Sequence, residues 1–152
     1  ANRPKSIVTA EAFASPRDKL AARRDEYDPY VATRLDGGSD ILAADYIAMH
    51  RERNATCVAV QAVTRPFDAL LLPTSPCVPP KIAPLDTTEA LMKASARVLR
   101  NTALSNYLDR PTITIPCHRA GEAPVGLSLM GSRHHDRRLL AIAAGVEGIV
   151  RG

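Results

Sequence analysis

The sequence of 152 residues predicts an α/β fold, in which helices pack on a short mixed sheet that includes a β-hairpin. Three observations point to this class. Apolar residues recur at helical spacing in the first part of the chain. Three short strand-like runs follow, at Phe67–Leu72, Thr112–Ile115 and Val125–Met130. Helical spacing returns between and after these runs. We therefore expect a helical segment over residues 1–66 and an α/β segment over residues 67–152, together forming one structural unit.

The first helices are predicted near the start of the chain. The segment Thr9–Tyr27 has helical composition, with Thr9 as the expected N-cap. Pro16 interrupts this pattern, so we expect the helix to break there and restart. A second short helix is expected over Pro29–Leu35, because a Gly-Gly pair follows it and glycine commonly ends helices.

Three further helices are predicted from their start and stop signals. The strongest pattern begins after Asp40, a good N-cap, and is ended by Pro66. Asp86 is the expected cap of a later helix, with a break near Asn101. Asp136 is the expected cap of a final amphipathic helix.

The strand-like runs differ in pattern. Phe67–Leu72 is almost continuously apolar, which is typical of a strand buried on both faces. The proline-rich segment Pro73–Pro84 is expected to be an extended loop. Thr112–Ile115 alternates β-branched residues, and Val125–Met130 follows after a loop, so these two predict a hairpin. If all three strands share one sheet, we expect its other strands to lie outside this chain.

Composition narrows the classes of function. The net charge is +4, but the basic residues are scattered and not interleaved with aromatics, so we expect no nucleic-acid partner. No apolar run of about 18 residues exists, so we expect no membrane partner. The three cysteines, Cys57, Cys77 and Cys117, have neither disulfide-framework nor zinc spacing. We expect no metal, no cofactor and a cytoplasmic location. Because the first residue is alanine, we also expect a processed or truncated chain.

Three stretches, in the correct order, resemble the end of the amidase signature family. Phe67–Pro76 is similar to the family's D-x-L-L-x-P-T-x-P strand and loop. Arg100–Cys117 resembles its N-x-x-G-x-P-A-x-x-x-P-C segment, and Ala123–Gly131 resembles P-V-G-L-Q-L-I-G. Asp109 stands where the family usually has glycine, and Ser128 where glutamine is common. The resemblance implies that the chain is the C-terminal portion of the amidase-signature mixed-sheet fold.

The resemblance also implies a reaction, the hydrolysis of a small-molecule carboxylic amide to a carboxylate and ammonia. In that family a serine nucleophile, a second serine and a lysine form the catalytic centre, on a Gly/Ser-rich segment and upstream of it. The nearest sequence here is Gly37-Gly38-Ser39-Asp40, which we interpret as a helix stop and a helix start. We therefore assign no catalytic residue and expect the segment to be inactive by itself.

Two alternatives stay open at this point. The chain is a non-catalytic binding or structural module derived from an amidase, or it is part of a glutamine-dependent amidotransferase subunit. An enzyme segment should expose an apolar face where the rest of the protein packs, and should self-associate through it. A module that works alone should be polar on all sides.

Four polar residues are the candidate substrate contacts: Thr74, Ser75, Asn106 and Asp109. Each lies in a loop beside a predicted strand, and ligands of α/β proteins commonly bind at strand ends. The alternative is that these side chains only satisfy turn backbone groups. His118 lies in the hairpin loop, where we expect it to be solvated.

Overall fold

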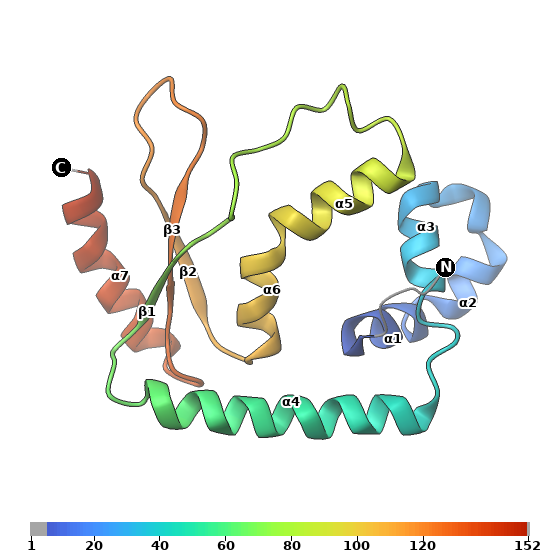
Figure 1. The fold of residues 1–152 in the computed structure, drawn as a ribbon, viewed down its shortest axis with the longest axis horizontal. Helices are drawn as coiled ribbons and strands as arrows, with labels where there is room; N and C mark the ends of the chain where they lie inside the picture. The colour runs from blue at the N-terminus through green and yellow to red at the C-terminus, as the bar shows by residue number, and fades with distance from the viewer. Residues whose placement is uncertain (1–5, 152) are drawn as a thin grey trace. The chain divides into compact units, whose positions relative to one another are not determined.

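A computed structural model describes residues 6–151 of the chain. The elements follow the order α1 (Ile7–Ala14), α2 (Arg17–Ala22), η1 (Arg24–Glu26), α3 (Pro29–Asp36), α4 (Ala43–Thr64), β1 (Leu70–Pro73), α5 (Thr88–Val98), α6 (Arg100–Tyr107), β2 (Thr112–Pro116), β3 (Gly126–Met130) and α7 (Asp136–Arg151) (Figure 1). The chain forms two compact units, and the boundary between them falls inside α4, between Ala55 and Thr56.

The first unit is helical, as its sequence predicts. Pro16 separates α1 from α2, and Asp28 caps α3 by accepting hydrogen bonds from the backbone of Tyr30 and Val31. Its buried apolar side chains include Leu20 and Ala32, which are 3% and 4% exposed. The predicted helix stop at Gly37-Gly38 is confirmed, since α3 ends at Asp36 and a turn follows.

The second unit contains a three-stranded sheet in the order β1-β3-β2. Both strand pairs are antiparallel, with Leu71 opposite Leu129 and Ile113 opposite Leu129. The β2–β3 hairpin is confirmed, and so is the α/β class. The mixed pairing expected from the sequence is not found among the described strands, which pair only antiparallel.

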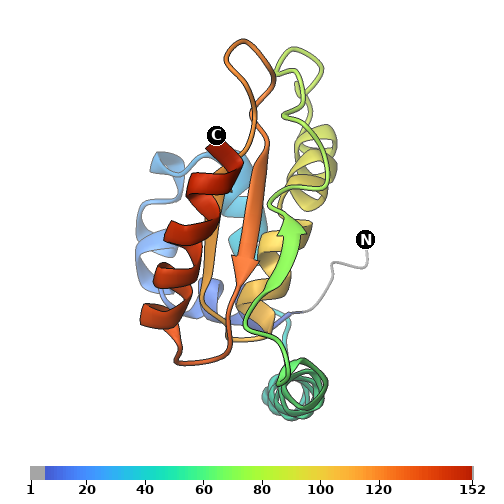
Figure 2. The same cartoon turned by 90° about the vertical axis from the view of Figure 1, so that its left-hand side faces the viewer.

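The sheet of the second unit has helices on both sides, with α7 on one face and α5 and α6 on the other (Figure 2). The α7 side holds the core, in which Leu139 and Ala143 pack on Ile115 and Leu129. Leu129 is 1% exposed, and burying a leucine of this kind contributes about 1.5–3 kcal/mol. The alternation along β2 and β3 therefore directs one set of side chains into this core.

Several helix starts differ from the sequence prediction. Ser6, not Thr9, caps α1, and Thr87, not Asp86, caps α5, because these are the residues whose backbone is extended before the helix begins. The long helix α4 begins three residues after Asp40, at Ala43, because Asp40 belongs to the turn that follows α3 and the Leu42 carbonyl accepts the hydrogen bond from Tyr46.

The last two helix boundaries also shift. The break between α5 and α6 lies at Leu99, whose N–H bonds to Ser95, and not at Asn101. In α7 the backbone carbonyl of His135 accepts the first hydrogen bond, from Leu139, so Asp136 occupies the first turn and not the cap.

The burial expected for the first strand is wrong. β1 begins at Leu70, because Phe67 still hydrogen-bonds to the end of α4 through Thr64. Along the strand the exposure alternates, and the side chain of Leu71 is 64% exposed. One face of this edge strand is therefore uncovered in the described part of the chain.

Candidate functional site

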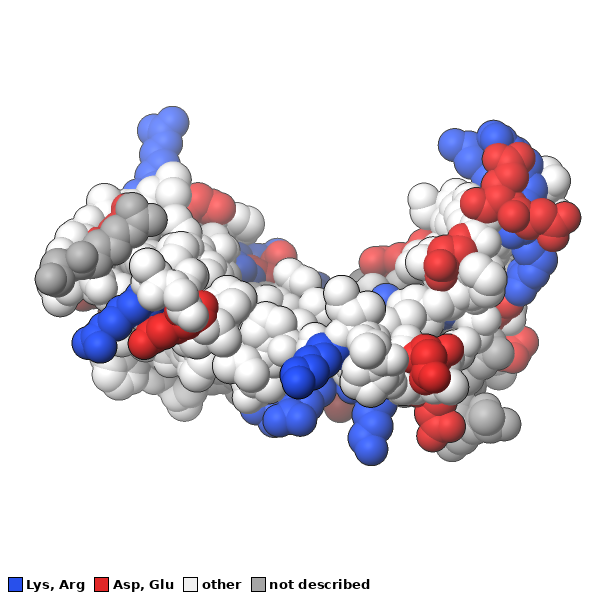
Figure 3. Space-filling model, turned by 90° about the horizontal axis from the view of Figure 1, so that it is seen from above, with Lys and Arg blue, Asp and Glu red and all other residues white. Residues whose placement is uncertain are grey.

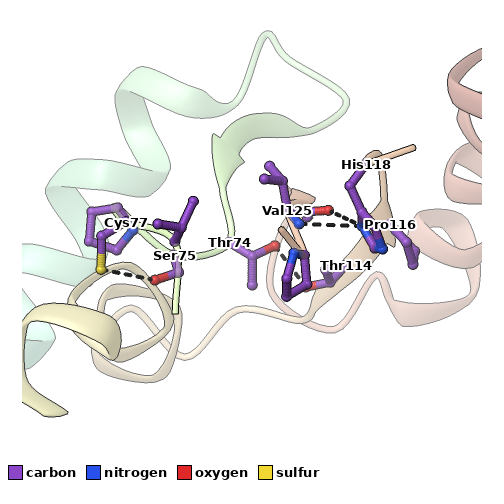
Figure 4. Close-up of a pocket in the computed structure, with 11 residues that line it drawn as sticks. Thr74, Ser75, Cys77, Thr114, Pro116, His118 and Val125 are labelled. Atoms are coloured by element: carbon purple, nitrogen blue, oxygen red, sulfur yellow. Dashed lines mark hydrogen bonds between the residues drawn. The ribbon is translucent and has the colours of Figure 1, made fainter. Parts of the chain in front are cut away.

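A hollow of about 450 Å³ lies where β1 ends and the β2–β3 hairpin loop begins. Three parts of the second unit contribute to it: the loop after β1, the end of β2 and the start of β3. The lining residues are Thr74, Ser75, Pro76, Cys77, Val78, Thr114, Pro116, His118, Pro124, Val125 and Gly126. Figure 4 shows the polar members of this set gathered around one space. The carboxyl end of β1 and the hairpin thus form an open, mostly apolar site with a few polar groups.

Three hydroxyl groups meet beside this hollow, one from each strand or its continuation. Thr74 Oγ1 lies 2.7 Å from Ser128 Oγ and 3.1 Å from Thr114 Oγ1, and the last two lie 3.1 Å apart. Strand pairing brings them together, because Thr114 is opposite Ser128 and the Thr74 N–H donates to Gly126. Each hydroxyl has one proton to donate, so the three contacts can be satisfied in a ring.

Gly126 makes this hydroxyl cluster possible. A Cβ at this position would lie 2.6 Å from Thr114 Cγ2 and 2.7 Å from Thr74 Oγ1, closer than real contacts allow. The requirement is therefore one of space, since only a residue without a side chain leaves room for both threonines.

The loop after β1 is anchored to the junction of α5 and α6. Ser75 Oγ donates to the Val98 carbonyl at 3.3 Å and lies 3.9 Å from Cys77 Sγ. Asn101 Nδ2 donates to the Pro73 carbonyl at 2.7 Å. In the described part of the chain these are the contacts of the Ser75 hydroxyl, and neither partner is a base that can activate it.

On the opposite side of the hollow, His118 is exposed, as the sequence predicts. Its Nδ1 accepts from the Val125 N–H at 3.3 Å and lies 3.2 Å from the Val125 carbonyl. These contacts orient the ring toward the hairpin backbone (Figure 4). The histidine thereby becomes a lining residue of the site.

The other two predicted site residues lie elsewhere. Asn106 and Asp109 line a second hollow of about 340 Å³, formed by the turn before β2 and the turn after β3. β3 runs from Gly126 at the first hollow to Met130, beside the second. Four residues of strand correspond to about 14 Å. The structure therefore brings Thr74 and Ser75 together at one end of the sheet, and Asn106 and Asp109 together at the other.

Sequence reasoning missed Thr114, Ser128 and Gly126. A signal existed, because Thr112 and Thr114 in one strand, and Gly126 and Ser128 in the other, are small or polar residues at alternate positions on one face of the hairpin. Their meeting depends on the register of the hairpin and on the addition of β1, which joins residues 54 positions apart.

Metal-ligand groups, membrane-crossing helices and charged surface would also be signs of function. Among the described residues, no group of three or more His, Cys, Asp and Glu side chains gathers as metal ligands would. Within residues 6–151 no helix is long and apolar enough to cross a bilayer. On the face drawn in Figure 3, basic and acidic side chains alternate with uncharged surface.

Comparison with known proteins agrees with the sequence motifs. The amidase family profile matches residues 5–140. A 2-amino-5-chloromuconic acid deaminase of Comamonas testosteroni is 31% identical over 145 residues, which are 95% of this chain and 31% of the relative. A glutamyl-tRNA(Gln) amidotransferase subunit of Sulfurisphaera tokodaii is 31% identical over 140 residues, which are 88% of this chain and 29% of the relative. The chain thus spans about three tenths of the length of these relatives.

Solved structures of an amidase and of a urea amidolyase are also similar to this chain. A crystal structure of an amidase has a TM-score of 0.71 at 25% identity, covering 93% of this chain and 33% of that one. The urea amidolyase of Kluyveromyces lactis has a TM-score of 0.79 at 25% identity, covering 91% of this chain and 8% of that one. Both likenesses extend over nearly all of the present chain.

Proposed function

Because this chain belongs to the amidase family, we propose that it is the C-terminal segment of a hydrolase that cleaves a carboxylic amide. Water adds to R–CO–NH₂, the C–N bond breaks, and a carboxylate and ammonia leave. The observation that carries this proposal is the hollow where β1 and the hairpin end, with hydroxyls at its edge and apolar walls. A carboxamide has a carbonyl oxygen that accepts hydrogen bonds and an NH₂ group that donates two. Hydroxyl groups can donate to the first and accept from the second.

Thr74 and Ser75 are the proposed substrate contacts in this chain. Both line the hollow, and their loop is held by the hydrogen bonds of Ser75 to Val98 and of Asn101 to Pro73. Preorganised polar groups of this kind orient a substrate without being reordered at each turnover. Asn106 and Asp109 line a separate hollow, and we propose another role for that hollow below.

We propose that the segment alone is inactive. Its Gly37-Gly38-Ser39 sequence forms the turn after α3, where Ser39 Oγ donates to the Asp36 carbonyl and contacts Asp40. A serine nucleophile requires a base within hydrogen-bond reach, and Ser75 has none among the described residues. Ser39 has the carboxylate of its neighbour Asp40 at 3.2 Å, but it lies in an exposed turn with no second serine or lysine beside it in the sequence. In this proposal, other parts of a longer protein supply the Ser-Ser-Lys centre, and residues 1–66 and 67–152 are the helical and α/β portions of the segment. A cytoplasmic location is part of the same proposal.

Exposed apolar side chains support a missing packing partner. In the second unit several large ones are more than half exposed: Val58, Val63, Phe67, Leu71, Val78, Ile82, Leu140 and Ile149. Isolated segments with such surface tend to self-associate, and we propose that this one does. Sedimentation velocity of the pure chain tests this, and a strictly monomeric chain at high concentration contradicts it.

Amide hydrolysis is tested on the protein as its own gene expresses it. The native protein is purified, its intact mass is compared with 16.4 kDa, and ammonia release is assayed on a panel of small amides. We expect a larger mass and amide hydrolysis, with Thr74→Val and Ser75→Ala raising KM. A native mass near 16.4 kDa without hydrolysis would favour the non-catalytic module instead.

A part in glutamine-dependent amide transfer is the second candidate. It rests on the likeness to the glutamyl-tRNA(Gln) amidotransferase, whose 31% identity equals that of the deaminase. If glutamine is the only panel member that is hydrolysed, and a partner protein is needed for activity, this second candidate replaces the first.

A further inference from the structure

The second hollow, at the end of the sheet away from the hairpin tip, contains a buried cation. The side chain of Arg110 is 9% exposed. Its Nη2 donates to Gln61 Oε1 at 2.8 Å and to Thr64 Oγ1 at 2.6 Å, and both acceptors are neutral. Within residues 6–151, no carboxylate forms an ion pair with it. A buried charge without a counter-ion is unfavourable, so this guanidinium favours an anion beside it.

A buried hydroxyl in the same hollow also has no partner. Ser105 is 5% exposed, and its Oγ makes no hydrogen bond with any described residue. The Arg110 N–H donates to the Ser105 carbonyl at 3.2 Å, which keeps the two residues side by side. Both residues line the hollow, one with an unsatisfied hydroxyl and the other with a guanidinium that has no acidic partner among the described residues.

The remaining lining side chains limit the charge of a ligand. Asp109 is neutralised by Arg133, whose Nη2 lies 2.5 Å from its carboxylate. Asp136 adds a second carboxylate, and His134 lines the hollow beside it. With Asp109 paired to Arg133, the hollow holds one further cation, Arg110, and one further carboxylate, Asp136, and that carboxylate disfavours a dianion such as phosphate. A singly charged group is therefore the better match.

The backbone around this hollow is also unusual. Asp109 and His134 both adopt left-handed conformations, with φ of 54° and 63°. A residue with a side chain pays about 1–2 kcal/mol for this conformation. The two turns that form the hollow are thus held in a defined geometry by the surrounding structure.

We propose that this hollow binds a small organic molecule through one carboxylate group, which accepts hydrogen bonds from the Arg110 guanidinium and the Ser105 hydroxyl. A guanidinium and a neighbouring hydroxyl match the two oxygens of a carboxylate. The hollow, at about 340 Å³, leaves room for the body of the ligand beyond its carboxylate. The proposal does not depend on the proposed amide hydrolysis, because the two hollows lie at opposite ends of the sheet.

The test is a titration of the 152-residue chain with sodium acetate, followed by the NMR shifts of its backbone amides. Sodium chloride at matched ionic strength and inorganic phosphate are titrated separately. We expect acetate alone to give saturable shifts around Ser105, Arg110 and His134, with a dissociation constant in the millimolar range because the ligand is so small.

Two variants and a control complete the test. Ser105→Ala and Arg110→Met should each weaken acetate binding about tenfold or more, the effect of losing one hydrogen bond to a charged group. Ser105→Ala removes only an unpaired hydroxyl, so it should fold even if Arg110→Met does not. Arg119→Met, in the exposed hairpin loop, should bind acetate unchanged. No saturable acetate shifts, equal shifts with chloride or phosphate, or full binding by Ser105→Ala would overturn the proposal.

Discussion

Substituting Gly126 by alanine tests whether the hydroxyl cluster is held by close packing. The new Cβ would lie 2.6 Å from Thr114 Cγ2 and 2.7 Å from Thr74 Oγ1. Both threonines belong to strand-paired backbone, so neither can move far without breaking the ladder. Overpacking of about 1–3 kcal/mol and the loss of one or two hydroxyl hydrogen bonds together predict a destabilisation of about 2–4 kcal/mol.

Gly145→Ala is the matched control in the same compact unit. Nothing lies within 4 Å of a Cβ at Gly145, which sits inside α7. Alanine in a helix is favoured over glycine, so this variant should gain about 0.5–1 kcal/mol. The same chemical change is thus expected to have opposite signs at the two glycines.

The assay is urea unfolding followed by far-ultraviolet circular dichroism, because the chain has no tryptophan. A second substitution tests whether the Thr114 methyl group causes the destabilisation. Thr114→Ser removes the Cγ2 methyl and keeps the hydroxyl, so in the Gly126→Ala background it should restore part of the lost stability. The packing explanation is refuted if Gly126→Ala changes the free energy of unfolding by less than about 0.5 kcal/mol, or if Thr114→Ser restores nothing.

Leu129→Ala, at 1% exposure, should lower the free energy of unfolding by about 2–5 kcal/mol, and a loss under about 1 kcal/mol in urea would contradict the assigned core. Ser105→Ala should raise the free energy of unfolding by about 1 kcal/mol without ligand, since it removes an unsatisfied buried hydroxyl; a decrease would mean that the hydroxyl has a partner. The Tyr46 hydroxyl donates to Glu11 at 2.8 Å, which raises the pKa of Tyr46. The stabilisation from this bond is present below the ordinary tyrosine pKa and is lost as pH rises through the raised value. Glu11→Gln should lower the Tyr46 pKa in an alkaline absorbance titration, and an unchanged pKa would exclude Glu11 as the cause.

The hairpin was predictable because its signals are local. Thr112–Ile115 and Val125–Met130 alternate in pattern, a turn segment separates them, and the structure pairs them in register. Helix starts were less predictable. The sequence around α1 and α5 offers two capping residues within a few positions, and only the backbone conformation selects Ser6 and Thr87.

Burial of β1 could not be predicted, because it depends on what covers the strand. A continuous apolar run indicates burial on both faces, and Leu71 is nonetheless 64% exposed. The same run would suit burial in a longer protein. The apolar run therefore agrees with the proposal that a further part of a longer protein packs on β1.

Only two of the four predicted site residues, Thr74 and Ser75, line the first hollow. Thr74 and Ser75 follow a strand that the sequence identifies, so their place at a strand end was predictable. Asn106 and Asp109 precede β2. Because β1 and β2 both pair antiparallel with β3, they run parallel to each other, and the start of β2 lies at the opposite end of the sheet from the end of β1. Had β1 and β2 run in opposite directions, the two pairs of residues would have shared an end.

The chemistry of the first hollow agrees with the proposed role of this chain as a substrate-binding segment. Strand pairing and the contacts of Ser75 and Asn101 fix hydroxyl groups at the sheet end, which suits orienting a substrate. Orientation alone does not activate a hydroxyl nucleophile, for which a base within about 3 Å is required. The described contacts of Ser75 are a carbonyl oxygen and a thiol. If the proposed amide-hydrolysing protein places its catalytic centre outside this chain, variants at Thr74 should change KM more than kcat.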